Sequence, residues 1–232
     1  MIDLYFAGTP NGYKLTMCLE ELGLPYRINR IGLSKGEQYA PAYLKISPNN
    51  KIPAMVDHAP ADGGQPLAIF ESGAMLQYLA DKTGRLWPRD LRARTMVSQW
   101  LFWQVGGLGP MAGQNGHFAV FAPEKVPYAI DRYMKETSRL YGVLDRRLVG
   151  REYIADEYSI ADIASYPWIV PHEAHGQKLD DFPNLKRWFH AVSSRPATVR
   201  AYEGAQQSYA QGAGAALTEE ERRILFGQGV RS

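Results

Sequence analysis

The sequence predicts a small α/β domain followed by an all-helical domain. Short apolar runs alternate with a helical pattern in the first 80 residues, whereas only helical patterns follow residue 90. Glycine and proline between Gly84 and Pro88 separate the two regions. The expected boundaries are a first domain at 1–83, a linker at 84–89, a second domain at 90–210 and a tail at 211–232.

The first region has the element order βαβ and then ββα. A strand, a helix and a strand within about 30 residues have the length of a βαβ unit with a right-handed crossover. The next two strands flank a Gly/Pro-rich turn, as in a hairpin. The expected elements are a strand at 2–6, a helix from Asn11 to Gly23, strands at 26–31, 53–57 and 67–70, and helices at 41–46 and 71–82.

The second region is expected to contain helices at 90–115, 124–149, 159–175, 183–194 and 197–209. Gly106, Gly107 and Gly109-Pro110 should kink or interrupt the first of these. Ser159 to Asp162 forms a capping box at a helix start. Residues 204–216 are rich in Gly, Ala and Gln and are expected to be flexible, with a short charged helix or tail at 218–226.

Composition narrows the functional classes. The chain has 232 residues, 45% of them hydrophobic and 22% charged, which is typical of a globular protein with a well-buried core. A net charge of +2 without a Lys/Arg run argues against a nucleic-acid partner. No apolar run approaches the ~18 residues of a membrane span, and the N-terminus lacks the basic region of a signal peptide. We therefore expect a cytoplasmic protein.

Cysteine and histidine usage predicts neither a disulfide nor a metal site. Cys18 is the single cysteine of the chain, so an internal disulfide and a cysteine-based zinc site are excluded. The five histidines lack metal-type spacing with carboxylate or cysteine partners. We expect no bound metal.

The segment Ser47 to Pro53 carries the first functional motif. Pro53 opens an apolar run, and because proline cannot donate a ladder hydrogen bond it belongs at a strand start. A cis Ile52-Pro53 bond would turn the backbone N–H and C=O of Ile52 toward solvent, where an extended peptide could pair with them. An ordinary proline-bounded turn is the alternative interpretation.

Phe70 to Gly73, where a strand passes into a helix, carries the second motif. A Glu-Ser pair here is compatible with simple helix capping. It is also compatible with an anion site, because the free N–H groups and dipole at the helix start would hold a carboxylate beside Ser72. Glu71 would accept a charged amine next to it. A ligand that needs both is an amino acid with free α-carboxylate and α-ammonium groups.

Taken together, these motifs resemble glutathione transferases. The order βαβ, a Pro-initiated strand, a hairpin and Glu-Ser at a helix start is similar to their thioredoxin-like glutathione-binding domain. The resemblance extends over nearly the whole chain and is closest to the bacterial nu class, which is described as glutathione-dependent disulfide-bond reductases. The segments that carry it are Thr9 to Gly12, Ser47 to Ala54, Trp100 to Met111, Ser159 to Asp162 and Ser194 to Ala197.

The resemblance implies a set of glutathione-binding residues. Glu71 and Ser72 would hold the γ-glutamyl end, and the backbone of Ile52, presented by Pro53, would pair with the cysteinyl unit. Three further residues are less specific. Gln38 could equally be solvated, Lys51 could be an exposed turn lysine, and Arg132 could pair with acidic neighbours on its helix. The implied binding set is Asn11, Gln38, Lys51, Ile52, Pro53, Glu71, Ser72 and Arg132.

Thr9 and Asn11 are implied as the catalytic residues. They lie between the first strand and the first helix, where capping is the alternative role. A hydroxyl or amide there, in front of a helix N-terminus, would lower the pKa of the glutathione thiol. No serine or cysteine stands at positions 9–11. Cys18 falls on the apolar face of the helix and is expected to be buried and inert, so the nucleophile would be the sulfur of glutathione.

Three functions are compatible with these residues. The first is reduction of small disulfides by the thiolate of bound glutathione through thiol–disulfide exchange, with the site expected to bind glutathione in its reduced or disulfide form. The second is conjugation of glutathione to small electrophiles. The third is a non-catalytic relative that keeps the fold for binding, against which the retained site residues argue. The resemblance also implies a homodimer.

Overall fold

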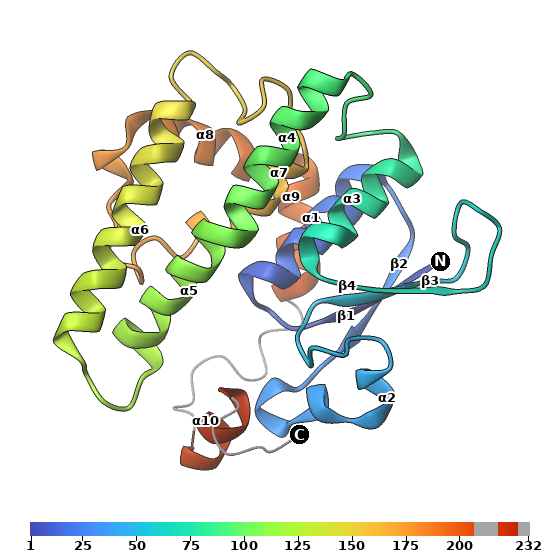
Figure 1. Ribbon diagram of the computed structural model, residues 1–232, viewed down its shortest axis with the longest axis horizontal. Helices are drawn as coiled ribbons and strands as arrows, with labels where there is room; N and C mark the ends of the chain where they lie inside the picture. The colour runs from blue at the N-terminus through green and yellow to red at the C-terminus, as the bar shows by residue number, and fades with distance from the viewer. Residues whose placement is uncertain (207–217, 227–232) are drawn as a thin grey trace. The chain divides into compact units, whose positions relative to one another are not determined.

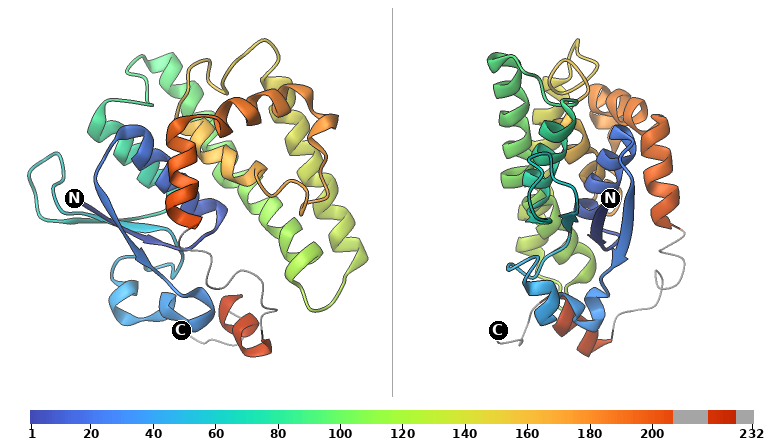
Figure 2. Two further views of the ribbon diagram at one scale, coloured as in Figure 1. Left: turned by 180° about the vertical axis from the view of Figure 1, so that it is seen from behind. Right: turned by 90° about the vertical axis from the view of Figure 1, so that its right-hand side faces the viewer.

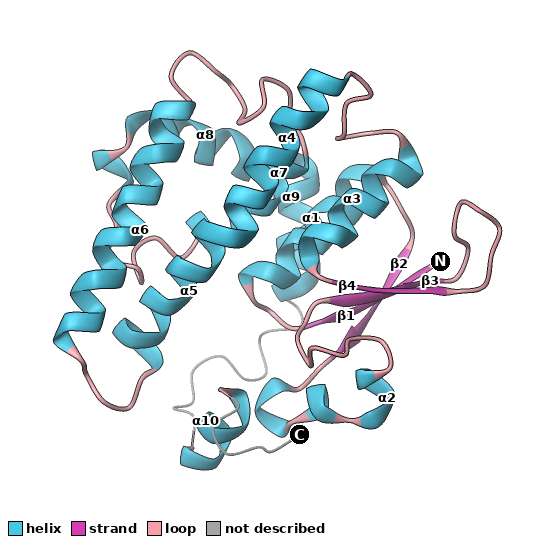
Figure 3. Cartoon of the chain, viewed as in Figure 1, coloured by secondary structure: helices cyan, strands magenta, loops and turns pink. Residues whose placement is uncertain are grey.

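The computed structural model describes residues 1–206 and 218–226 and confirms the α/β-then-helical architecture. These residues cluster into two compact units. One contains Met1–Lys82 together with the described residues from Arg200 onward, and the other contains Thr83–Val199. All four strands belong to the first unit (Figure 3). Most of the Gly/Ala-rich segment expected to be flexible, from residue 207 onward, and most of the expected tail lie outside the described residues.

The first unit contains a four-stranded mixed sheet with the order β2-β1-β3-β4. β1 pairs in parallel with β2 and antiparallel with β3, and β3 pairs antiparallel with β4. The elements are β1 (Ile2–Phe6), α1 (Pro10–Leu22), β2 (Tyr26–Arg30), η1 (Leu33–Lys35), η2 (Glu37–Tyr39), α2 (Pro41–Leu44), β3 (Ala54–Asp57), β4 (Leu67–Phe70) and α3 (Ser72–Thr83). The order predicted from the sequence is confirmed.

The strand register aligns three chain positions at one edge of the sheet. Tyr5 on β1 lies opposite Ala54 on β3, which in turn lies opposite Phe70 on β4. Consequently the end of β1, the start of β3 and the end of β4 meet at this edge. The helices α1 and α3 cover one face of the sheet, and α2 lies beyond the other (Figure 1). The two helices that follow β1 and β4 therefore begin near one another.

Residues at both ends of α1 define where the helix begins and ends. Thr9, in an extended conformation, caps the N-terminus, and its side-chain oxygen accepts a hydrogen bond from the backbone N–H of Gly12. Pro10 occupies the first helical position, where its missing N–H costs nothing. Gly23 ends the helix in the left-handed conformation with φ 68°.

The second unit is built from helices. They are α4 (Leu91–Trp103), η3 (Gln104–Leu108), α5 (Gly109–Gly116), η4 (His117–Phe121), α6 (Pro127–Arg147), α7 (Ile160–Ile169), η5 (Leu179–Asp181), α8 (Pro183–Ser193) and α9 (Pro196–Gln206), the last of which runs on into the first unit. Among the described residues, no helix combines the length and the apolar character that crossing a membrane requires.

Two of these helices differ in extent from the sequence prediction. The helix expected at 90–115 stays helical from Leu91 to Phe121, and a π-helical turn at η3 interrupts it at the predicted glycines; a second π-helical turn, η4, was not predicted. The backbone N–H of Gly109 bonds the carbonyl of Gln104, five residues back, and Pro110 has no N–H to offer the previous turn. The helix expected to reach residue 175 ends at Ile169, shortly before Pro171.

The described residues from Arg200 onward group with the first unit, although the sequence analysis assigned residues up to 210 to the second domain and 211–232 to a tail. The Arg200 guanidinium pairs with the Glu20 carboxylate at 2.8 Å, and Tyr202 stacks on Tyr13 with ring centroids 4.2 Å apart. The helix α10 (Glu219–Leu225) packs against η1 (Figure 2). These contacts join positions about 180 residues apart, which helical periodicity alone does not encode.

The predicted capping box at the start of α7 is present, and it does more than cap. The fully buried Asp162 carboxylate accepts hydrogen bonds from the backbone N–H groups of Ser159 and Ile154, each at 3.0 Å, and from the indole N–H of Trp188 at 2.8 Å. The carboxylate thus joins the start of α7 to α8 and to the preceding loop.

Replacing Asp162 with alanine should destabilise the protein. The substitution leaves two buried backbone donors and an indole N–H without acceptors, so we expect a loss of about 3 kcal/mol in the free energy of unfolding. Chemical denaturation followed by circular dichroism measures it. The exposed Asp181→Ala substitution is the control and should change stability by less than about 0.5 kcal/mol. Equal effects of the two substitutions would contradict this role of Asp162.

Candidate functional site

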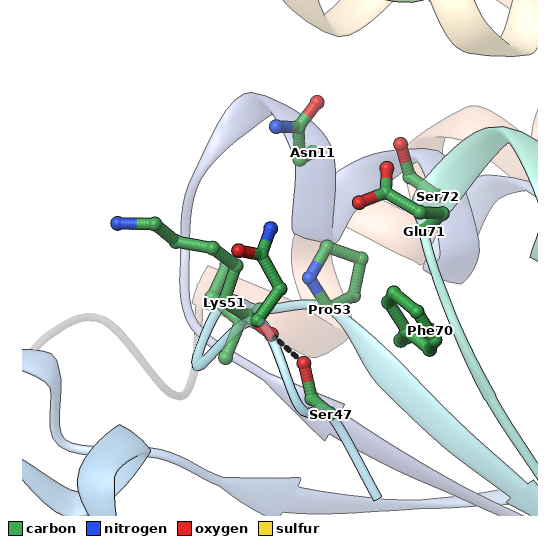
Figure 4. A pocket seen from close by; sticks show the side chains of 9 residues that line it. Asn11, Ser47, Lys51, Pro53, Phe70, Glu71 and Ser72 are labelled. Carbon is green, nitrogen blue, oxygen red and sulfur yellow. Dashed lines mark hydrogen bonds between the residues drawn. The ribbon is translucent and has the colours of Figure 1, made fainter. Parts of the chain in front are cut away.

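A polar cavity of about 210 Å³ opens at the sheet edge where β1, β3 and β4 meet (Figure 4). Its walls come from the start of α1, the loop that leads into β3, and the junction of β4 with α3. The residues that line it are Asn11, Ser47, Asn49, Lys51, Ile52, Pro53, Phe70, Glu71 and Ser72. The segments that form the two sequence motifs therefore share one cavity.

The first wall of the cavity is the start of α1, which packs closely against the end of β1 at Gly12. A side-chain carbon at position 12 would lie 2.3 Å from the carbonyl oxygen of Ala7 and 2.9 Å from the Phe6 ring, so only glycine fits there. Gly12 lets the first turn of α1 lie against the end of β1, and this turn carries Asn11 into the cavity wall. The Thr9 oxygen beside it accepts from Gly12, which leaves the Thr9 hydroxyl hydrogen able to donate elsewhere.

Two buried hydroxyl groups hold the second wall. Tyr43 and Ser47 both donate to the backbone carbonyl of Lys51, at 2.7 and 2.9 Å. The Ile52-Pro53 peptide bond that follows is cis, which is the first of the two alternatives that the sequence left open. Ser47 and Pro53 are buried, whereas the Lys51 side chain is exposed. The loop is therefore anchored by its backbone while its charged side chain remains available to a ligand.

The third wall is the junction of β4 and α3. The sequence placed Glu71 in the first helical turn, but α3 begins at Ser72, and Glu71 precedes it with φ 70°. A positive φ at a non-glycine residue costs on the order of 1 kcal/mol and is typical of functional sites. The Glu71 carbonyl accepts the N–H of Met75 at 3.0 Å, so the residue still starts the helix. Figure 4 shows Glu71 and Ser72 side by side, across the cavity from Lys51.

A buried lysine lies behind Ser72. Lys14 extends from α1 and is only 1% exposed, and its ammonium group donates to the Ser72 hydroxyl oxygen at 3.2 Å. Burial lowers the pKa of Lys14 to about 7, against the opposing effect of the Glu71 carboxylate. The arrangement places a cation behind Ser72 and an anion beside it.

The cavity unites most of the predicted binding residues. Those that line it are Asn11, Lys51, Ile52, Pro53, Glu71 and Ser72. Thr9, Gln38 and Arg132 do not. Thr9 is the cap of α1. Gln38 is buried, and its amide donates to the Leu33 carbonyl at 3.1 Å. Arg132 belongs to the second unit, on α6, with its guanidinium 4.0 Å from Glu136.

Ser47, Asn49 and Phe70 belong to the two sequence motifs and line the cavity, but they were not among the predicted binding residues. Lys14, behind Ser72, was not singled out from the sequence at all. For Lys14 a signal was present, because the residue stands four positions before Cys18 and therefore shares the apolar face of α1. Cys18 itself is fully buried, as predicted. Among the described residues, no three His, Cys, Asp or Glu side chains gather in a way that could hold a metal ion.

The cavity is suited to a zwitterionic ligand with an extended backbone. A carboxylate would meet the Ser72 hydroxyl and the N-terminus of α3, where the helix dipole favours negative charge. An ammonium group would meet the Glu71 carboxylate. The peptide group of Ile52 also lies in the cavity wall, between Lys51 and the Glu71-Ser72 pair. The Lys51 ammonium group could bind a second carboxylate of the ligand.

Two family models match the chain and agree with this fold. Residues 9–82 match the N-terminal domain of glutathione S-transferases, and residues 108–196 match the C-terminal domain. The chain belongs to the glutathione S-transferase family.

Individual relatives are similar over most of their length. The chain is 56% identical to the disulfide-bond oxidoreductase YfcG of Escherichia coli over 207 residues, covering 89% of this chain and 96% of that protein. A glutathione transferase family member from Pseudomonas fluorescens, crystallised with two glutathione bound, is 47% identical with a TM-score of 0.82 over 87% of this chain and 92% of that one. A glutathione transferase from Pseudomonas putida with one glutathione disulfide bound per subunit is 42% identical, with a TM-score of 0.81 over 86% and 90% of the two chains.

Lys14→Met should stabilise the folded protein at pH 7 by about 2 kcal/mol, because it removes a charge that is costly to bury. The folded state releases the Lys14 proton near pH 7 and the unfolded state only near 10.5, so unfolding takes up a proton in between. The free energy of unfolding of the wild-type protein therefore rises between pH 7 and 10.5, whereas that of the variant lacks this contribution. The advantage of the variant over wild type becomes smaller as the pH rises. Denaturant titrations at pH 7 and 9 measure it; a variant less stable than wild type at both would contradict the prediction.

Proposed function

We propose that this protein is a glutathione-dependent disulfide-bond reductase. The observation that carries the proposal is a cavity with paired charges for an amino-acid end group and no protein thiol among its lining residues. The one cysteine of the chain is fully buried in α1. The reacting sulfur would therefore belong to glutathione. The similarity to a disulfide-bond oxidoreductase, and to a protein that binds glutathione disulfide, supports the same reaction.

In the proposed complex glutathione lies along the cavity with its γ-glutamyl end at Glu71 and Ser72. The α-carboxylate meets Ser72, the α-ammonium meets the Glu71 carboxylate, and the cysteinyl backbone pairs with the peptide group of Ile52. The glycine carboxylate reaches toward the exposed Lys51. These contacts place the thiol near the start of α1, beside Asn11.

The proposed reaction is two successive thiol–disulfide exchanges. The glutathione thiolate attacks one sulfur of the substrate disulfide, forming a mixed disulfide and releasing the first substrate thiolate, which takes up a proton. A second glutathione thiolate attacks the glutathione sulfur of the mixed disulfide and releases the other substrate thiol. In total, two glutathione molecules become one glutathione disulfide and the substrate disulfide becomes two thiols. The protein supplies orientation and electrostatic stabilisation of the thiolate.

Asn11 and Thr9 are proposed to stabilise that thiolate. The Asn11 amide and the Thr9 hydroxyl can donate hydrogen bonds at the N-terminus of α1, whose dipole also favours a negative charge. A free thiol has a pKa of about 8.5, so a decrease of one or two units converts most of it to thiolate at neutral pH.

Several finer proposals rest on the sequence resemblance. They are membership of the nu class, a homodimeric assembly, a place in the cytoplasm, and glutathione contacts from Gln38 and Arg132. Conjugation of glutathione to an electrophile is the second candidate reaction, since the same thiolate would serve. The buried Cys18 does not separate the two reactions, because neither requires a protein thiol.

A comparison of two assays tests the proposed function. Purified protein is given reduced glutathione with either a hydroxyalkyl disulfide or an aryl halide. We expect disulfide reduction to exceed conjugation by at least about tenfold in kcat/KM, a difference of about 1.4 kcal/mol in transition-state stabilisation. Strong conjugation without disulfide turnover would favour the second reaction. Binding of glutathione without either activity would contradict both.

Two alanine substitutions locate the nucleophile. Cys18→Ala should retain disulfide reductase activity within about twofold, because Cys18 is buried and a small apolar side chain replaces it. Asn11→Ala should lower kcat by about tenfold or more, with little change in the free energy of unfolding, because it removes a donor to the thiolate. Steady-state kinetics with a thermal unfolding control measures both. Loss of activity in Cys18→Ala with a normal melting temperature would place the nucleophile on the protein.

A further inference from the structure

A buried positive charge, the ammonium group of Lys14, lies behind Ser72 at the γ-glutamyl corner of the cavity. A lysine that is 1% exposed is unusual, because burying an ammonium group is costly. One of its hydrogen bonds goes to the hydroxyl oxygen of Ser72. The carboxylate of Glu71 also acts on Lys14 through its charge. Glu71 is exposed at the cavity and faces the proposed ammonium group of the ligand.

The hydrogen bond between Lys14 and Ser72 has a direction that matters for binding. The ammonium group donates to the hydroxyl oxygen of Ser72 at 3.2 Å. A hydroxyl has one hydrogen to donate and can accept on its oxygen at the same time. Because Lys14 occupies an acceptor position, the Ser72 hydrogen can be directed into the cavity. A cation behind the hydroxyl polarises it and makes it a stronger donor to a carboxylate.

We propose that Lys14 is a positioning residue that makes this corner selective for ligands with a free γ-glutamyl α-carboxylate, acting through Ser72. The inference rests on the proposed glutathione site and adds to it the source of the positive charge. With ligand bound, the corner holds two matched pairs. The ligand carboxylate lies against Ser72 with Lys14 behind it, and the ligand ammonium lies against Glu71. A glutathione analogue without the α-carboxylate would lack the interaction with Ser72 and Lys14.

Protonation supports the same assignment. Burial brings the pKa of Lys14 to about 7, with Glu71 raising it, so part of the population is neutral at pH 7 to 8 before ligand binds. An arriving carboxylate favours the charged form and raises this pKa. Binding is therefore coupled to proton uptake: the affinity is highest below pH 7 and falls as the pH rises toward the higher pKa of the complex.

The test uses two ligands whose thiol is blocked, so that thiol ionisation does not contribute. One is S-methylglutathione, and the other is the same tripeptide with hydrogen in place of the γ-glutamyl α-carboxylate. Isothermal titration calorimetry gives the affinities for wild type, Lys14→Met, Lys14→Gln and the exposed-lysine control Lys178→Met. We expect both Lys14 substitutions to weaken S-methylglutathione binding at least about tenfold and to change binding of the analogue less than about twofold. Lys178→Met should change neither.

Equal weakening of both ligands would indicate a merely structural role for Lys14 and would overturn the proposal, as would no weakening of either. If neither variant folds, proton uptake by the wild-type protein decides the matter. Calorimetric titration of the wild-type protein at pH 7.5 in two buffers of different ionisation enthalpy measures the protons taken up on ligand binding. We expect net proton uptake with S-methylglutathione and none with the analogue. No proton uptake with either ligand overturns the proposal. A wild-type protein that binds S-methylglutathione and reduces disulfides keeps the proposed function even then, whereas one that binds neither ligand contradicts both.

Discussion

The register between β1, β3 and β4 is the constraint on which the candidate site depends. Because Tyr5, Ala54 and Phe70 lie in one row across the sheet, the chain leaves β1, enters β3 and leaves β4 at the same edge. A slip of one residue would turn every side chain of a strand to the other face. It would also separate Pro53 from Glu71. The apolar faces of the strands, buried under α1 and α3, hold the register in place and so hold the cavity together.

Charged and polar groups surround the cavity that this register forms. Glu71 stands in a left-handed conformation at the mouth, Ser72 opens α3, and Lys14 lies behind Ser72 without contact with solvent. The protein thereby keeps a costly cation in its interior. In our interpretation this cost is offset when a carboxylate binds, which links the stability of the fold to the occupancy of the site.

Much of this fold was predictable from the sequence, because its elements are locally encoded. Pro53 predicted a strand start, and Ser159 with Asp162 predicted a capped helix, each through a residue whose chemistry allows few alternatives. The grouping of Arg200 with the first unit was not predictable, because it depends on contacts distant in sequence. Lys14 was missed for a different reason. A lysine on a helix is usually solvated, and only the assembled sheet and helices show that α3 covers this one.

The orientation of glutathione in the cavity is the central claim, and a crystal structure of the complex tests it most directly. Crystals of the protein grown with glutathione should show the γ-glutamyl α-carboxylate within hydrogen-bond distance of the Ser72 hydroxyl. The α-ammonium should lie beside Glu71, and the cysteinyl backbone should pair with Ile52. Glutathione bound in the opposite direction, with its glycine carboxylate at Ser72, would contradict the account, as would glutathione bound away from this cavity.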